Sequence, residues 1–95
     1  MSTKYIPKSL GEQVAAALKN VDICLAAANA TKEDIVQVRQ YIVNFLPQDP
    51  KRVELYTEWL GDLRPPSTNI GCQSLAHKDL LYEIEVVCVV KHDAS

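Results

Sequence analysis

The sequence predicts a single α+β domain in which two helices cover one face of a small sheet. Apolar residues recur at helical spacing in two segments, and β-branched residues alternate or cluster in three others. In chain order these are a helix at 9–28, a strand at 35–45, a helix at 49–63, and strands at 67–73 and 80–90. The 95 residues suit one domain, with an N-terminal segment at 1–8, a core at 9–91 and a tail at 92–95.

The first helix is predicted from its cap and its stripe. Ser9 and Glu12 match a capping box, in which each side chain bonds an amide at the start of a helix. Asn29 is a residue type that tolerates the left-handed conformation at a helix end. Apolar residues at spacings of three and four lie between them: Val14, Leu18, Val21, Leu25 and Ala28.

The first strand, "IVQVRQYIVNF", is rich in β-branched and aromatic residues. Its partial alternation assigns Val36, Val38 and Ile42 to one face and Gln37, Arg39 and Tyr41 to the other. The segment "LPQDP" then ends the strand.

The second helix has Pro50 at its start and Gly61 near its end. Its apolar residues at helical spacing are Val53, Tyr56, Leu60 and Leu63. We expect Tyr56 and Trp59 to pack in the core.

The last two strands follow "RPPST", which cannot continue a helix. In the final strand one face carries Tyr82, Ile84, Val86, Cys88 and Val90, and the other carries Leu81, Glu83, Glu85, Val87 and Val89. Both faces are apolar towards the end of the strand, so both must be covered. Because two helices cover only one face, we expect a second copy of the chain to cover the other.

Composition argues against several classes of function. The net charge of −2 and the scattered basic residues exclude a phosphate-binding stripe, so we expect no nucleic-acid partner. The longest apolar run near the end, "VVCVV", is too short to span a membrane. Cys24, Cys72 and Cys88 lack paired spacing and are expected to be reduced, buried thiols of a cytoplasmic protein. His77 and His92 have no convergent ligands, so no metal site is expected.

Several segments together resemble the Rid family, also called YjgF/YER057c/UK114. They are "GEQVAAALKNVDICLAAANAT", "DIVQVRQYIV", "LYTEWLGDLRPPSTNIG" and "LAHKDLLYEIEVVCVV", in the order of the family and covering residues 11–90. The resemblance implies a chorismate-mutase-like α+β fold with a mixed sheet. It also implies a homotrimer in which three sheets form a central barrel and ligand clefts lie between subunits. Active members hydrolyse 2-imino acids to 2-oxo acids and ammonia without a cofactor.

The chain departs from active members at the positions that bind substrate. Those members carry an arginine two residues after the proline at the strand entry, and this position is Ser67 here. A serine offers one neutral hydrogen bond where a guanidinium offers two charged ones. The second-helix asparagine falls at Val53, and "MSTKYIPK" is too short to form the opening hairpin of the family.

The remaining candidate site residues are few. Glu83 matches the family glutamate that positions substrate or water. The alternative interpretation of Glu83 is a structural one, in which its carboxylate is paired across a subunit interface. Ser67, Asn69 and Arg64 are the candidate substrate-binding residues, with Arg64 included because it lies near the lost arginine's position.

Three readings of function follow. The first is a homotrimer that binds or acts on a small carboxylate or imine-type metabolite between subunits, without the usual imine deaminase activity. The second is a working 2-iminobutanoate/2-iminopropanoate deaminase that uses Glu83. The third is a truncated, non-catalytic remnant of the fold.

Overall fold

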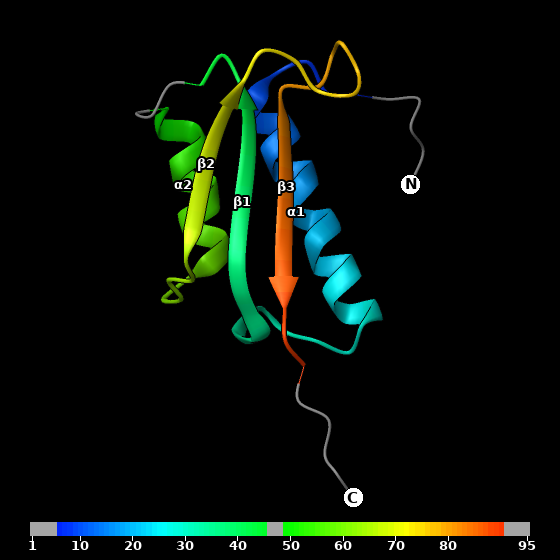
Figure 1. The fold of residues 1–95 in the computed structure, drawn as a ribbon, viewed down its shortest axis with the longest axis vertical. Coiled ribbons are helices and arrows are strands. Elements are labelled where there is room, and N and C mark those ends of the chain that lie inside the picture. The colour runs from blue at the N-terminus through cyan, green and yellow to red at the C-terminus, as the bar shows by residue number, and fades with distance from the viewer. Residues whose placement is uncertain (1–5, 46–48, 91–95) are drawn as a thin grey trace, which may run out of the picture.

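A computed structural model describes residues 6–45 and 49–90, and it has the predicted order of helices and strands (Figure 1). The elements are α1 (Leu10–Ala27), the short 3-10 helix η1 (Lys32–Asp34), β1 (Ile35–Val43), α2 (Pro50–Leu60), β2 (Ser67–Cys72) and β3 (Tyr82–Cys88). The strands form a sheet in the order β2-β1-β3, with β2 parallel and β3 antiparallel to β1. Both helices lie on one face of this mixed sheet, as expected.

Local sequence signals set the ends of α1. The Ser9 hydroxyl accepts a hydrogen bond from the amide of Glu12 at 3.1 Å, which confirms the predicted cap. The carboxylate of Glu12 accepts from the Ser9 hydroxyl at 2.9 Å, where we expected it to accept from the Ser9 amide. Asn29 has a φ of 59°, so the left-handed stop is confirmed.

The strand β1 contains an irregularity that the alternation did not predict. Its register with β3 shifts between Ile35 and Gln37, as in a β-bulge. The extra residue, Val36, is 46% exposed, so its assignment to the face of Val38 and Ile42 was wrong. Gln40 takes the inward position between Val38 and Ile42 and is only 1% exposed.

The helix α2 begins at Pro50 as predicted, but it is rotated relative to the predicted stripe. Asp49 accepts hydrogen bonds from the amides of Lys51 and Arg52, and Pro50 occupies the first helical position. Arg52 is buried, whereas Val53, which we placed on the apolar stripe, is 42% exposed. The inward face of this helix therefore begins with a cation.

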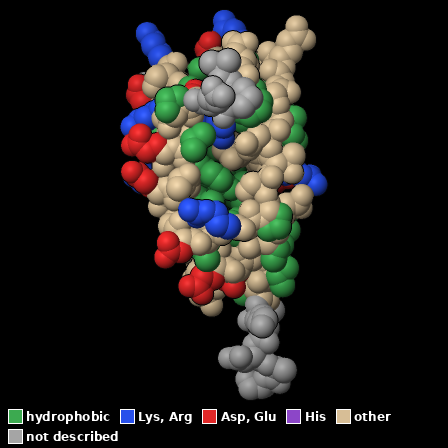
Figure 2. All heavy atoms as spheres, turned by 90° about the vertical axis from the view of Figure 1, so that its left-hand side faces the viewer, with side chains coloured by type: hydrophobic (Ala, Val, Ile, Leu, Met, Phe, Trp, Pro, Cys, Tyr) green, Lys and Arg blue, Asp and Glu red, His purple; other side chains and the backbone are tan. Residues whose placement is uncertain are grey.

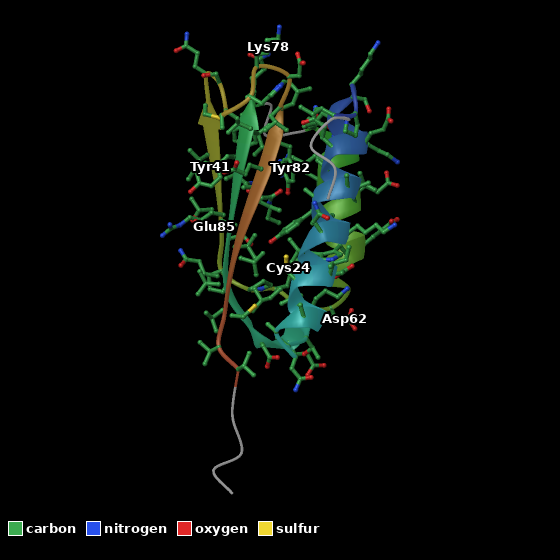
Figure 3. All side chains as sticks on the ribbon, turned by 90° about the vertical axis from the view of Figure 1, so that its right-hand side faces the viewer. Cys24, Tyr41, Asp62, Lys78, Tyr82 and Glu85 are labelled. Atoms are coloured by element: carbon green, nitrogen blue, oxygen red, sulfur yellow. The ribbon has the colours of Figure 1, made fainter. Side chains whose placement is uncertain are left out.

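The core lies between the helices and the sheet. Two clusters of buried apolar residues form it, with Tyr56 and Trp59 packed against both, as expected for core aromatic residues. The first cluster contains Val14, Leu18, Ile42 and Tyr82, and the second contains Leu25, Ala30, Ile35 and Val38. The opposite face of the sheet carries no helix (Figure 3).

Candidate functional site

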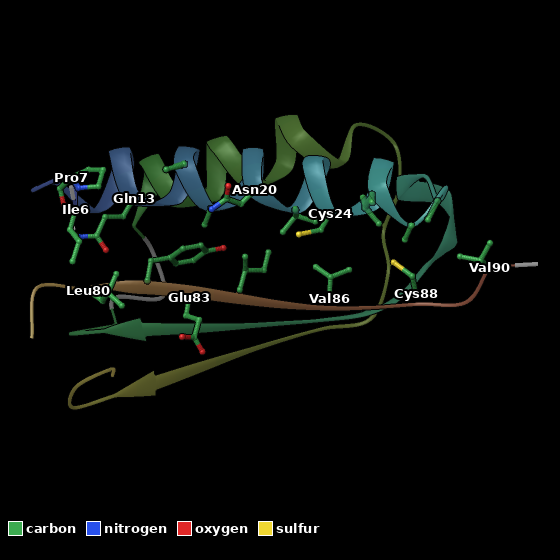
Figure 4. A pocket seen from close by; sticks show the side chains of 18 residues that line it. Ile6, Pro7, Gln13, Asn20, Cys24, Leu80, Glu83, Val86, Cys88 and Val90 are labelled. Atoms are coloured by element: carbon green, nitrogen blue, oxygen red, sulfur yellow. Dashed lines mark hydrogen bonds between the residues drawn. The ribbon is translucent and has the colours of Figure 1, made fainter. Parts of the chain in front are cut away.

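Glu83 lies on the helix-free face of the sheet. It pairs with Tyr41 across β1 and β3, and it is exposed. Figure 4 shows its side chain pointing away from the helices, whereas Val86 and Cys88 on the same strand point towards α1. Within residues 6–45 and 49–90 its carboxylate has no hydrogen-bond partner. One chain therefore leaves Glu83 available to a ligand or to another subunit.

The surroundings of Glu83 mix charge with exposed apolar surface. Arg39 and Glu85 form an ion pair at 3.2 Å, and because both side chains are about half exposed the pair adds little stability. Figure 3 shows Tyr41 and Glu85 on this face and Tyr82 directed to the helices. Val87 is 44% exposed beside them and Val89 is 59% exposed. In Figure 2 hydrophobic side chains are visible along the sheet side, while acidic side chains gather over the helices.

Ser67 and Asn69 lie on the other face. In the parallel pairing of β1 with β2 they stand beside Val38 and Gln40, whose side chains are buried against the helices. The Ser67 hydroxyl lies 2.7 Å from the Tyr56 hydroxyl of α2, and Asn69 accepts a hydrogen bond from the Gln40 amide at 3.0 Å. These two candidate residues therefore do not meet Glu83 within one chain.

A buried polar network connects Asn69 to the interior, and sequence analysis missed it. The Gln40 carbonyl oxygen accepts from the Tyr82 hydroxyl at 2.7 Å and from the Arg52 guanidinium at 3.4 Å. Burial raises the pKa of the Tyr82 phenol above its usual range, and the neighbouring Arg52 partly opposes that shift. The sequence signal that could have predicted this network is Gln40, a polar residue at a strand position that faces the core.

Arg52 is a buried cation without an ionic partner among the described residues. It is 2% exposed, its Nε has no partner among the described residues, and its guanidinium lies 5.3 Å from the centre of the Phe45 ring. The carboxylate of Asp49 bonds the backbone amide of Arg52. A buried charge without an ionic partner is costly, so the protein carries Arg52 at the expense of stability.

Arg64 does not contact the other candidate residues. Its guanidinium donates to the carbonyl oxygens of Gly61 and Leu63 at 2.7 and 2.6 Å, at the end of α2. A cation in this position stabilises the unpaired carbonyls of a helix end. That Ser67 stands at the position of the family arginine stays a prediction.

The cysteines are less buried than predicted. All three cysteines are free, but Cys24 is exposed and Cys72 and Cys88 are half-buried, so the expectation of buried thiols was wrong. Cys24 lines an open pocket between α1 and β3 (Figure 4), which leaves its side chain accessible. Burial raises the pKa of the Cys88 thiol, and Asp34 adds to the shift.

His77 lies in the loop before β3, and His92 lies outside the described residues. Within the described ranges no three His, Cys, Asp or Glu residues lie close enough together to bind a metal ion.

Comparison with known proteins identifies the family. The family model described as endoribonuclease L-PSP matches residues 1–90. The chain belongs to this family. No curated protein matches the chain. The predicted relationship to the Rid (YjgF/YER057c/UK114) family and its chorismate-mutase-like fold is confirmed.

Solved structures of Rid-family proteins are similar to the chain over most of its length. The Rv2704 protein of Mycobacterium tuberculosis is 27% identical with a TM-score of 0.81, over 90% of this chain and 71% of that one. YyfB of Yersinia pestis is 32% identical with a TM-score of 0.75, over 86% and 64%. YyfA from the same organism is 26% identical with a TM-score of 0.80, over 92% and 68%. The relatives therefore contain additional polypeptide.

The described part of the chain contains no helix that is both long enough and apolar enough to cross a bilayer.

Proposed function

We propose that this Rid-family chain acts in the cytoplasm as a homotrimer that binds a small carboxylate or imine-type metabolite between subunits, without a cofactor and without the usual imine deaminase activity. The observation that carries the proposal is the division of the candidate residues between two faces of the sheet. Glu83 is on the helix-free face, and Ser67 and Asn69 are on the helix-covered face at the edge strand β2. A site that uses both needs residues from two copies.

The helix-free face supports the trimer. Val36, Val87 and Val89 expose roughly half of their surface on or beside it, in a domain too small to leave such a face in water without cost. We expect light scattering to give three times the chain mass of 10.6 kDa. Val87→Asp should dissociate the assembly, whereas Ile23→Asp, at a 58% exposed site on α1, should not. A compact wild-type monomer at micromolar concentration would refute the trimer.

The absence of deaminase activity follows from Ser67. Replacing a charged double contact to the substrate carboxylate by one neutral bond removes about 1.5–3 kcal/mol, or one to two decades of affinity. The Ser67 hydroxyl already shares a hydrogen bond with the Tyr56 hydroxyl, so it is less available to bind a ligand.

The test is a coupled assay with 2-iminopropanoate, together with NMR titration of 2-oxobutanoate as a carboxylate probe. We expect negligible turnover and shifts around Ser67, Asn69 and Glu83 that Glu83→Gln alters. Turnover abolished by Glu83→Gln would replace this proposal with the deaminase reading. A folded trimer with neither turnover nor shifts would favour a non-catalytic remnant of the fold.

A further inference from the structure

Gln40 is a polar side chain enclosed in the core, and hydrogen bonds hold both ends of its amide. It lies on β1 and is 1% exposed. Its carbonyl oxygen, Oε1, accepts from the Tyr82 hydroxyl at 2.7 Å and from the Arg52 guanidinium at 3.4 Å. Its amide nitrogen, Nε2, donates to the Oδ1 atom of Asn69 at 3.0 Å. Gln40 therefore connects a buried cation of α2 to an exposed residue of β2.

Arg52 determines which way the Gln40 amide is oriented. A guanidinium has N–H donors and no acceptor, so the Gln40 atom that faces it must be the oxygen. The Tyr82 phenol acts in the same direction, because burial raises its pKa and keeps its proton in place as a donor. A reversed Gln40 would place its NH2 group against the donors of Arg52 inside the core, where an unmet donor is costly. The nitrogen of Gln40 must therefore face β2.

The orientation of Gln40 in turn fixes that of Asn69. Because Gln40 donates, the Asn69 carboxamide must turn its oxygen towards Gln40. Its nitrogen, Nδ2, then faces away from Gln40 and has no hydrogen-bond partner within residues 6–45 and 49–90. Asn69 is exposed, so this NH2 group is accessible to a ligand.

The neighbouring Ser67 supplies no free donor. It lies two residues before Asn69 on the same face of β2, at a spacing of about 7 Å. Its hydroxyl lies 2.7 Å from the Tyr56 hydroxyl and 3.2 Å from the Pro65 carbonyl oxygen, to which it donates. A hydroxyl has one proton, so these two bonds leave none for a ligand. The donor of the candidate pair is therefore Asn69.

We propose that Gln40, held by Arg52, is a positioning residue that sets the specificity of the ligand site. It keeps the Asn69 NH2 group outward, where that group donates to a carboxylate or carbonyl oxygen of the ligand. A ligand group that can only donate, such as an ammonium, meets the Asn69 donors and is disfavoured. The contact between Asn69 and the ligand rests on the proposed function, whereas the orientation of the Asn69 carboxamide does not.

Gln40→Glu tests the orientation, because it reverses the hydrogen bond to Asn69. One oxygen of the substituted side chain still accepts from Arg52 and Tyr82, and the other can only accept from Asn69. We expect the Asn69 NH2 group to exchange its protons freely in wild type, and about tenfold or more slowly in the variant, by side-chain amide NMR. Gln73→Glu, the same chemical change at an exposed site after β2, should leave this exchange unchanged.

The ligand contact is tested by NMR titration with 2-oxobutanoate. We expect its dissociation constant to rise about tenfold or more in Gln40→Glu and in Asn69→Asp, and to stay within about twofold of wild type in Gln73→Glu. Asn69→Asp changes an exposed side chain, keeps an acceptor for Gln40 and removes the donor. It therefore decides the contact even where the core variant does not fold, which circular dichroism shows.

The possible failures are distinguishable. Slow exchange of the Asn69 NH2 group in wild type, or equal exchange in wild type and Gln40→Glu, overturns the orientation. Equal affinity of wild type and Asn69→Asp for 2-oxobutanoate overturns the ligand contact and leaves the proposed function standing. A wild-type protein that gives no shifts with 2-oxobutanoate refutes the proposed function together with the contact, while the exchange rates still decide the orientation.

Discussion

Replacing Gln13 by leucine should destabilise the domain strongly, because one buried side chain connects three segments. Gln13 is 5% exposed. Its amide nitrogen donates to the carbonyl oxygens of Pro7 at 2.8 Å and Asp79 at 3.0 Å, and its oxygen accepts from the amide of Leu81 at 2.7 Å. The side chain thus joins the start of the described chain, α1 and the entry to β3.

The magnitude follows from these three bonds. Each is worth about 1 kcal/mol net, and the substitution also leaves the half-buried Leu81 amide without its acceptor. Leucine has a similar volume, so it opens no cavity, and its apolar surface recovers about 1 kcal/mol. We expect a net loss of about 2–3 kcal/mol, which lowers Tm by roughly 8–20 °C in a domain of this size.

Urea unfolding followed by circular dichroism, at one fixed protein concentration, measures this loss. Lys19→Leu, at an exposed site on the same helix, is the matched control and should change the free energy of unfolding by less than about 0.5 kcal/mol. If Gln13→Leu is as mild as the control, the three hydrogen bonds do not hold these segments together and the reasoning is wrong.

Three further predictions concern the inner side of α2 and the network beneath it. Arg52→Met should be neutral or stabilising by about 1 kcal/mol or more in urea unfolding, because it removes a buried cation that has no ionic partner among the described residues; a clear loss of stability would contradict this. The raised pKa of the Tyr82 phenol means that its neutral form stabilises the fold below pH 10, and that this contribution is lost as the pH rises further. The urea midpoint should therefore fall above pH 10 less in Tyr82→Phe than in wild type, and equal slopes would contradict this. Asp49→Ala should cost about 1 kcal/mol through loss of the α2 cap, and an unchanged urea midpoint would exclude that role.

The sequence by itself determined features that depend on neighbours in the chain. Ser9 and Asp49 cap the helices, and Asn29 ends α1, because each acts on backbone groups within a few residues. The alternation in β3 is equally local, and it correctly placed Tyr82 inward and Glu83 outward. Family membership also followed from the order of such segments.

Only the tertiary structure decided which residues share a site. The bulge that exposes Val36 arises from the pairing of β1 with β3, and the burial of Arg52 depends on how α2 rotates against Gln40. The separation of Ser67 from Glu83 follows from two strand registers, one parallel and one antiparallel, on opposite sides of β1. Periodicity tells which residues of a strand share a face, but register between strands is a long-range property that no single segment encodes.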